Sequence, residues 1–219
     1  NRSPFNVDTD FAGVSIAVYV PFIWTSSPSV PAKDLKDLAN LLKSNKSLQY
    51  NYGSTGPGST MHVLGEAYKK EAGVSMEHIP FKGVAEGMQS LIGGHIMGHS
   101  DSTGWAPHVD EERLRLLATY GSKRTKRWPN VQTLEELGYE TVSDSPFGVC
   151  GPKGMDPAVV KTLQNAFKAT LDDPNVIAAL QKFDQPVIYL DTAAYTKYAR
   201  ETFNAEKATI ERLGMANKS

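Results

Sequence analysis

Strand-like and helix-like segments alternate at short intervals along most of this 219-residue chain. Apolar stretches typical of strands lie at residues 14–20, 48–52, 76–80, 96–100 and 114–120, and the first of them either ends at Pro21 or continues irregularly to Trp24. Apolar residues recur with the period of an amphipathic helix at residues 35–42, 61–68 and 84–92. Parallel strands need a crossover, which is usually a helix, so this alternation predicts an α/β fold with a parallel or mixed sheet flanked by helices.

The last third of the chain has a more helical pattern. A short strand is expected at 147–151 and another at 187–190, and between them the apolar period predicts helices at 157–171 and 176–183. A final helix follows the second strand.

Residues that favour helix starts predict where three of these helices begin. Pro31 is expected in the first turn of the helix at 35–42. Asp156 is expected to cap a helix whose first residue is Pro157, and Thr192 is expected to cap the final helix.

The charge and the cysteine content exclude several classes of protein. The formal net charge is −1, and a chain without basic excess is poorly suited to neutralise phosphates, so nucleic acid is not expected as a partner. The apolar runs are too short to span a bilayer. Cys150 is the single cysteine, which excludes an intrachain disulfide, and its apolar strand predicts inert packing.

The most informative stretch is the glycine-rich segment from Tyr52 to Thr60, which follows a strand and opens a helix. Backbone N–H groups and the helix dipole favour an anion at such a place. The segment lacks the lysine of a P-loop and the glycine order of a dinucleotide fingerprint. A small carboxylate therefore fits better than a polyphosphate, and a tight turn with a capped helix is the alternative. The candidate ligand-binding residues are Gly53, Ser54, Thr55, Gly56, Gly58, Ser59 and Thr60.

A second polar segment, Ser100 to Gly104, also follows a strand. Asp101 could cap the following turn, which is the commoner role, or could receive an amine or hydroxyl of a substrate. Asp101, Ser102 and Thr103 are the candidate ligand-binding residues of this segment.

Two arrangements of potentially reactive side chains occur in the sequence, and neither is complete. His95, His99 and Asp101 could share one strand face, but no fourth ligand is evident, so no metal site is expected. Ser59 and His62 suggest serine–histidine chemistry, but the G-x-S-x-G motif is missing. No enzymatic activity and no cofactor are therefore predicted, with a serine hydrolase at the glycine loop as an alternative.

Seven motifs in order resemble the extracytoplasmic solute receptors of tripartite tricarboxylate transporters, the Bug family. Each motif is weak alone, and together they extend over nearly all of the chain. They are Pro28-Ser-Val-Pro-Ala, Tyr52-Gly-Ser-Thr-Gly-Pro-Gly-Ser, Ile79-Pro-Phe-Lys-Gly, Leu91-Ile-Gly-Gly-His, Ser100-Asp-Ser-Thr-Gly-Trp-Ala-Pro-His, Lys123-Arg with Trp128-Pro-Asn-Val-Gln-Thr-Leu, and Gly151-Pro-Lys-Gly-Met-Asp.

The resemblance implies a periplasmic-binding-protein-like fold of two α/β lobes. Residues 1–18 would be an inter-lobe crossover, 19–141 a near-complete ligand-binding lobe, and 142–219 the C-terminal helical part of the other lobe. The family also implies a periplasmic location, a small carboxylate ligand and a partnership with the membrane components of the transporter.

One part of the family pattern has no counterpart in this sequence. The family's first strand and the loop after it, which would supply the other half of the carboxylate grip, are expected to be missing. Apolar faces of the C-terminal helices, at Val160, Leu163 and Phe167, would then be exposed or repacked. Two alternatives follow: an interaction domain that has lost ligand binding, and a homo-oligomer formed through these helices.

Overall fold

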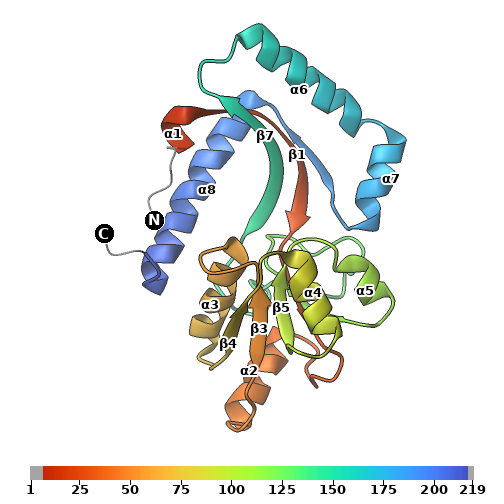
Figure 1. Cartoon of the computed structure of the whole chain (residues 1–219), viewed down its shortest axis with the longest axis vertical. Helices are drawn as coiled ribbons and strands as arrows, with labels where there is room; N and C mark the ends of the chain where they lie inside the picture. Colours follow the sequence, from red (N-terminus) through yellow and green to blue (C-terminus); the bar gives the residue numbers. More distant parts are fainter. Residues whose placement is uncertain (1–6, 217–219) are drawn as a thin grey trace. The chain divides into compact units, whose positions relative to one another are not determined.

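The computed structural model describes residues 7–216, which form parts of two compact units (Figure 1). Unit 1 combines the N-terminal segment up to Tyr19 with Pro146–Gln181 and Gln185–Ala208. Unit 2 combines Val20–Ser145 with Lys182–Asp184 and the segment from Thr209 onward. The lobe limits that we expect from the sequence stay a prediction. Residues 1–6 of the expected crossover lie outside the described residues.

Unit 1 is built on a three-stranded sheet in the order β7–β1–β8. Strands β1 and β8 are antiparallel, with Ile16 opposite Leu190. The strands are β1 (Phe11–Pro21), β7 (Asp144–Pro152) and β8 (Val187–Leu190). The helices are α1 (Val7–Asp10), α6 (Pro157–Leu171), α7 (Pro174–Lys182) and α8 (Thr192–Leu213), although Lys182 and the end of α8 from Thr209 are assigned to unit 2.

The helices of unit 1 are only partly covered. Val160, Leu163 and Phe167 on α6 are half-buried, whereas Leu171 at its end is buried. Phe203 on α8 is half exposed, at 50%. Cys150 is exposed on β7, so the expectation of a packed thiol was wrong: this strand is only partly covered, and Phe147 and Gly148 on it are exposed as well.

One of the three expected helix starts is confirmed. Asp156 caps α6, accepting a 2.7 Å hydrogen bond from the Ala158 amide, and Pro157 is the first helical residue. The α8 cap is Asp191, not Thr192, because the Asp191 side chain accepts from the Ala194 amide while Thr192 is already helical.

The expected position of Pro31 was also wrong. Asp34 caps α2 and accepts a 2.8 Å bond from the Asp37 amide, so Pro31 lies in the preceding loop. Because the side chain of Asp34 caps the helix, α2 begins at Leu35 and does not include Pro31 in its first turn.

Unit 2 contains a five-stranded mixed sheet in the order β4–β3–β5–β2–β6. Strand β3 is parallel to β4 and to β5, whereas β2 is antiparallel to β5 and to β6. The predicted mixed sheet flanked by helices is confirmed. Its strands are β2 (Ile23–Ser26), β3 (Asn51–Ser54), β4 (Glu77–Pro80), β5 (Gly98–Asp101) and β6 (Arg115–Thr119). Its helices are α2 (Leu35–Ser44), α3 (Thr60–Ala72), α4 (Val84–Ile92) and α5 (Ala106–Asp110).

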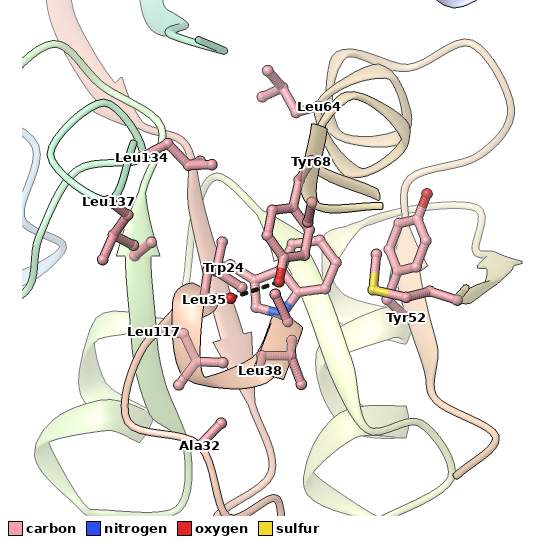
Figure 2. Packing of buried hydrophobic residues seen from close by; sticks show 14 of the residues in the cluster. Trp24, Ala32, Leu35, Leu38, Tyr52, Leu64, Tyr68, Leu117, Leu134 and Leu137 are labelled. Carbon is pink, nitrogen blue, oxygen red and sulfur yellow. Dashed lines mark hydrogen bonds between the residues drawn. The ribbon is translucent and has the colours of Figure 1, made fainter. Parts of the chain in front are cut away.

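Two apolar layers cover the sheet of unit 2, as strand alternation requires. Trp24 and Leu117 belong to the layer that also contains residues of α2 and α3 (Figure 2). Their neighbours Ile23 and Leu116 belong to the other layer, with Met88 of α4. A sheet covered on both faces is the architecture of α/β domains.

Strands β3 and β5 end later than the sequence pattern indicated. Gly53 and Ser54 are strand residues, because the parallel ladder with β4 continues to the pair Ser54–Pro80. Asp101 likewise belongs to β5, one residue beyond the expected end at Ser100, and it pairs with Ile23 of β2. The loops that follow these strands are therefore shorter than expected.

The described helices include none that combines the length and the apolar character needed to cross a membrane.

A buried hydrogen bond joins α3 to the start of α2. The hydroxyl of Tyr68 donates to the Leu35 carbonyl oxygen at 2.7 Å within the apolar layer (Figure 2). We expect Tyr68→Phe to lower the free energy of unfolding by about 1 kcal/mol, because this bond is lost without a change of packing. Chemical denaturation measures the change, and Tyr139→Phe is the control. The Tyr139 hydroxyl has no described partner, so an equal loss in both variants would contradict the assignment.

Candidate functional site

The parallel pairing of β3 with β5 brings the two polar segments to one edge of the sheet. Tyr52 lies opposite Gly98, and Gly53 lies opposite His99. The loops after Ser54 and after Asp101 therefore leave the sheet at its carboxyl edge, beside each other. Open α/β sheets bind ligands at this edge.

Ser59 ends the glycine-rich loop and starts α3. Its hydroxyl accepts a 3.3 Å bond from the His62 amide, which caps the helix, and donates to the Gly56 carbonyl oxygen at 2.8 Å. Gly56 and Gly58 have φ values of 107° and 79°. Side chains other than glycine rarely adopt this left-handed backbone, so both positions require glycine for the turn itself.

Several donors of the loop are already used inside the protein. The Gly56 amide donates to the Ser54 hydroxyl at 3.3 Å, and the Ser59 amide donates to the Gly56 carbonyl oxygen at 3.2 Å. The Gly58 amide donates to Nδ1 of His62 at 3.0 Å. These bonds fix the shape of the loop, so these N–H groups are not available to a ligand in this conformation.

Another set of donors has no acceptor among the described residues. It consists of the backbone amides of Thr55, Thr60 and Met61 and the hydroxyls of Thr55 and Thr60. Two of these amides belong to the first turn of α3, where unpaired N–H groups and the helix dipole attract negative charge. These donors are neutral groups that can hold a small anion.

The two strand residues among the candidates lie behind the loop. Gly53 and Ser54 are buried, and a Cβ at Gly53 would come within 2.6 Å of the His99 ring. Glycine is therefore needed at position 53 for packing. Contact of Gly53 or Ser54 with a ligand stays a prediction.

Asp101 closes the turn after β5. Its Oδ1 accepts from the amides of Ser102 at 2.6 Å and Thr103 at 3.3 Å, and the side chain is fully buried. This is the turn-capping role, one of the two that the sequence left open. Direct contact of the Ser102 and Thr103 hydroxyls with a ligand stays a prediction.

The geometry at Ser59 does not form a serine–histidine dyad. The Ser59 hydroxyl donates to Gly56, and the His62 ring nitrogen that faces the loop accepts from Gly58. A serine–histidine hydrogen bond does exist between the Ser54 hydroxyl and Nε2 of His78, at 2.7 Å. Because Ser54 is fully buried, this hydroxyl is not placed to attack a substrate.

Sequence reasoning missed His78, which reaches Ser54 from the neighbouring strand β4. The sequence pattern gave no signal for this contact, because it depends on the parallel pairing of β4 with β3. His95 was expected to share a strand face with His99, but it is exposed and precedes β5. Within residues 7–216, no group of three or more His, Cys, Asp or Glu side chains is arranged to hold a metal ion.

Both imidazoles beside the loop favour the neutral form. His62 and His78 stack with ring centroids 4.0 Å apart. Burial lowers the pKa of His78 to about 4, and a charge on His62 and on Lys69 adds to this effect, while Glu66 opposes it. Burial is also the main cause of the lowered pKa of His62. Near neutral pH, the loop is therefore bordered by uncharged rings.

The family model described as "Tripartite tricarboxylate transporter family receptor" matches residues 1–215. A Cupriavidus necator protein, the "UPF0065 protein in gbd 5'region", is 42% identical over 211 residues, which are 96% of this chain and 62% of that protein. "Protein BugT" of Bordetella pertussis is 29% identical over 178 residues, which are 80% of this chain and 54% of BugT. The chain thus spans less than two thirds of the length of these relatives.

Solved structures confirm the predicted periplasmic-binding-protein-like fold. "Structure of a periplasmic transporter" has a TM-score of 0.89 at 26% identity, over 96% of this chain and 71% of the other. An R. palustris protein with adipate has a TM-score of 0.87 at 22% identity, over 98% and 72%. MatC from Rhodopseudomonas palustris with bound malate has a TM-score of 0.76 at 21% identity, over 97% and 71%.

The low pKa of His78 predicts a loss of stability in acid. In the unfolded chain His78 takes up a proton at about pH 6.5, whereas in the folded chain it takes up a proton only at about pH 4. The free energy of unfolding is therefore highest above this window and falls as the pH drops through it. We expect His78→Gln, which cannot titrate, to lose about 1 kcal/mol less than the wild type across the window, a figure discounted because the ring is partly exposed.

Denaturant unfolding at several pH values measures this difference. His95→Gln is the matched control, because His95 is exposed and its replacement is expected to leave the pH dependence as it is. Parallel curves for the wild type and His78→Gln would show that the native state does not disfavour the charged His78 ring.

Proposed function

Because the chain belongs to the tripartite tricarboxylate transporter receptor family, we propose that it acts as an extracytoplasmic solute receptor for a small carboxylate. The observation that carries this proposal is the set of uncommitted donors at the start of α3. The amides of Thr55, Thr60 and Met61 have no acceptor among the described residues, and they lie in the loop at the carboxyl edge of the sheet.

The carboxylate would bind through hydrogen bonds and the helix dipole. Its two oxygens would accept from the Thr60 and Met61 amides in the first turn of α3, and the Thr55 amide and the two threonine hydroxyls would supply further donors. Bonds from N–H to a carboxylate are charge-assisted, and each is worth more than a neutral bond. The segment 52–60 contains no lysine or arginine, so the carboxylate would be held there by neutral donors alone.

The second loop would contact the remainder of the solute. Ser102 and Thr103 follow Asp101, which holds their amides, so their hydroxyls remain the polar groups that this loop offers. Two of the solved structures with a similar fold contain adipate and malate, which are dicarboxylates. This supports a solute with polar groups at both ends. We propose that the Ser102–Thr103 loop distinguishes between such solutes.

The place of action and the transport partner follow from the family alone. We propose that the receptor works in the periplasm and delivers its solute to the membrane components of a tripartite tricarboxylate transporter. Association of copies through the C-terminal helices stays a prediction from the sequence.

Small carboxylates are expected to stabilise the protein against heat. A ligand present at about 100 times its dissociation constant adds roughly 2.7 kcal/mol to the free energy of unfolding. Thermal melting with malate, adipate and several amino acids measures this effect, and malamide and adipamide are the matched neutral controls. If none of the acids raises the melting temperature, or if the amides raise it equally, an interaction domain without carboxylate binding is favoured.

Thr60→Pro tests the role of a backbone amide directly. Thr60 is the first residue of α3, where proline is well tolerated, and Ser59 has φ −67° and ψ 156°, which suits a residue before proline. The variant therefore removes one free N–H group and keeps the helix. We expect it to weaken carboxylate binding about 10-fold or more relative to Thr60→Ala, as the loss of a charge-assisted hydrogen bond predicts.

Thr60→Ala is the matched control because it removes the same hydroxyl and keeps the amide. Isothermal titration of both variants gives the ratio of their dissociation constants. Equal affinities in two folded variants would show that the carboxylate does not bind at the start of α3.

A further inference from the structure

Two stacked histidines lie against the glycine loop, and they come from different elements. His62 belongs to the first turn of α3, and His78 belongs to β4. Their ring centroids are 4.0 Å apart, and the planes are inclined by 22°. The pair therefore connects α3, the helix after the loop, with β4, the strand that pairs with β3.

His62 holds the outer part of the loop through its ring. Nδ1 accepts the Gly58 amide at 3.0 Å, so this nitrogen carries no proton. The His62 amide also donates to the Ser59 hydroxyl, so one residue is bonded to two positions of the turn. Gly58 is exposed with φ 79°, and a Cβ there would meet no neighbouring atom within 4 Å, so packing does not hold it in place.

His78 holds the inner part of the loop through Ser54. Its Nε2 is hydrogen-bonded to the Ser54 hydroxyl at 2.7 Å, and the same hydroxyl accepts the Gly56 amide at 3.3 Å. The two rings thus fix the amides of Gly56 and Gly58, which lie between the free donors of Thr55 and Thr60. The direction of those donors depends on these contacts.

The charged and titratable groups around the pair are Glu66 and Lys69 on α3 and Tyr52 on β3. The Tyr52 hydroxyl donates to Glu66 at 2.9 Å, and Lys69 forms an ion pair with the same carboxylate. Glu66 favours a charged His62, but burial and Lys69 oppose it, and burial has the largest effect. A proton on Nδ1 of His62 would face the Gly58 N–H group, and two donors cannot bond to each other.

We propose that His62 and His78 are positioning residues that hold the glycine loop in its carboxylate-accepting conformation while both rings are neutral, and that protonation of His62 releases the loop. The effect on affinity rests on the proposed function, whereas the effect on loop geometry does not. A carboxylate receptor built in this way loses affinity as the surroundings become acidic. If His62 acted only through its charge, the carboxylate affinity would instead rise in acid, because a positively charged His62 attracts an anion.

The first experiment follows the Gly58 amide by NMR in the free protein between about pH 8 and about pH 4, because burial lowers the pKa of His62 below the ordinary histidine value of about 6.5. We expect its chemical shift to change with the titration of the His62 ring and its hydrogen exchange to accelerate beyond the intrinsic pH dependence as that ring gains a proton. A Gly58 resonance that does not follow His62 overturns the inference, whether or not the protein binds carboxylates.

The second experiment compares two replacements of His62. The carbonyl oxygen of His62→Asn can take the place of Nδ1 as an acceptor and does not titrate, whereas His62→Leu has no acceptor. We expect His62→Asn to bind carboxylates nearly as the neutral wild type does at every pH, and His62→Leu to bind about 5-fold more weakly, as the loss of one backbone hydrogen bond predicts. Melting curves establish that both variants are folded.

The ligand for this comparison is an acid that stays ionised over the whole pH range. As the pH falls, we expect the affinity of the wild type to change from that of His62→Asn to that of His62→Leu. Equal affinity of the two variants, or wild-type affinity that rises in acid, overturns the inference. If no carboxylate binds at any pH, the proposed function is wrong, and the Gly58 titration still decides whether the histidine pair holds the loop.

Discussion

The parallel pairing of β3 with β5 is the interaction on which the rest of the site depends. Its register places Gly53 opposite His99, so the two strands end together and their loops start from one edge. Parallel strands have their carboxyl ends on the same side, and the loop after β3 leads into α3, whose first-turn N–H groups lie beside that edge. A shift of one residue in this pairing would bury the free donors or turn them away from the edge.

The same pairing requires two glycines where no turn exists. The His99 ring lies against Gly53 on β3 and Gly87 on α4, and a Cβ at either position would overlap it. Interiors are packed densely, so a large ring between a strand and a helix needs small residues on both sides. His99 also faces Asp101, with Nδ1 and Oδ2 3.4 Å apart, and Asp101 holds the second loop. Packing behind the sheet edge thus supports both loops.

The sequence predicted those parts of the structure that depend on local periodicity. Most of the strands and helices, their alternation in an α/β fold and the start of α6 at Pro157 follow from apolar spacing and capping residues, which act within a few positions. The short strand β2 was not predicted as an element separate from β1. The strand ends at Ser54 and Asp101 were missed because pairing with distant strands extends them. Periodicity contains no information on such pairing.

The candidate site was predictable as a region but not in its internal bonding. Glycines and hydroxyl residues before an apolar helix indicate an anion-binding turn, and that signal is local. The division of its donors into used and free ones was not predictable, because it depends on His78, which lies 24 positions from Ser54 in the chain. Two neutral rings fix the amides of Gly56 and Gly58, so the remaining donors of Thr55, Thr60 and Met61 are few and uncharged. A monovalent carboxylate group matches that number of donors, whereas a polyphosphate would retain most of its charge without a partner.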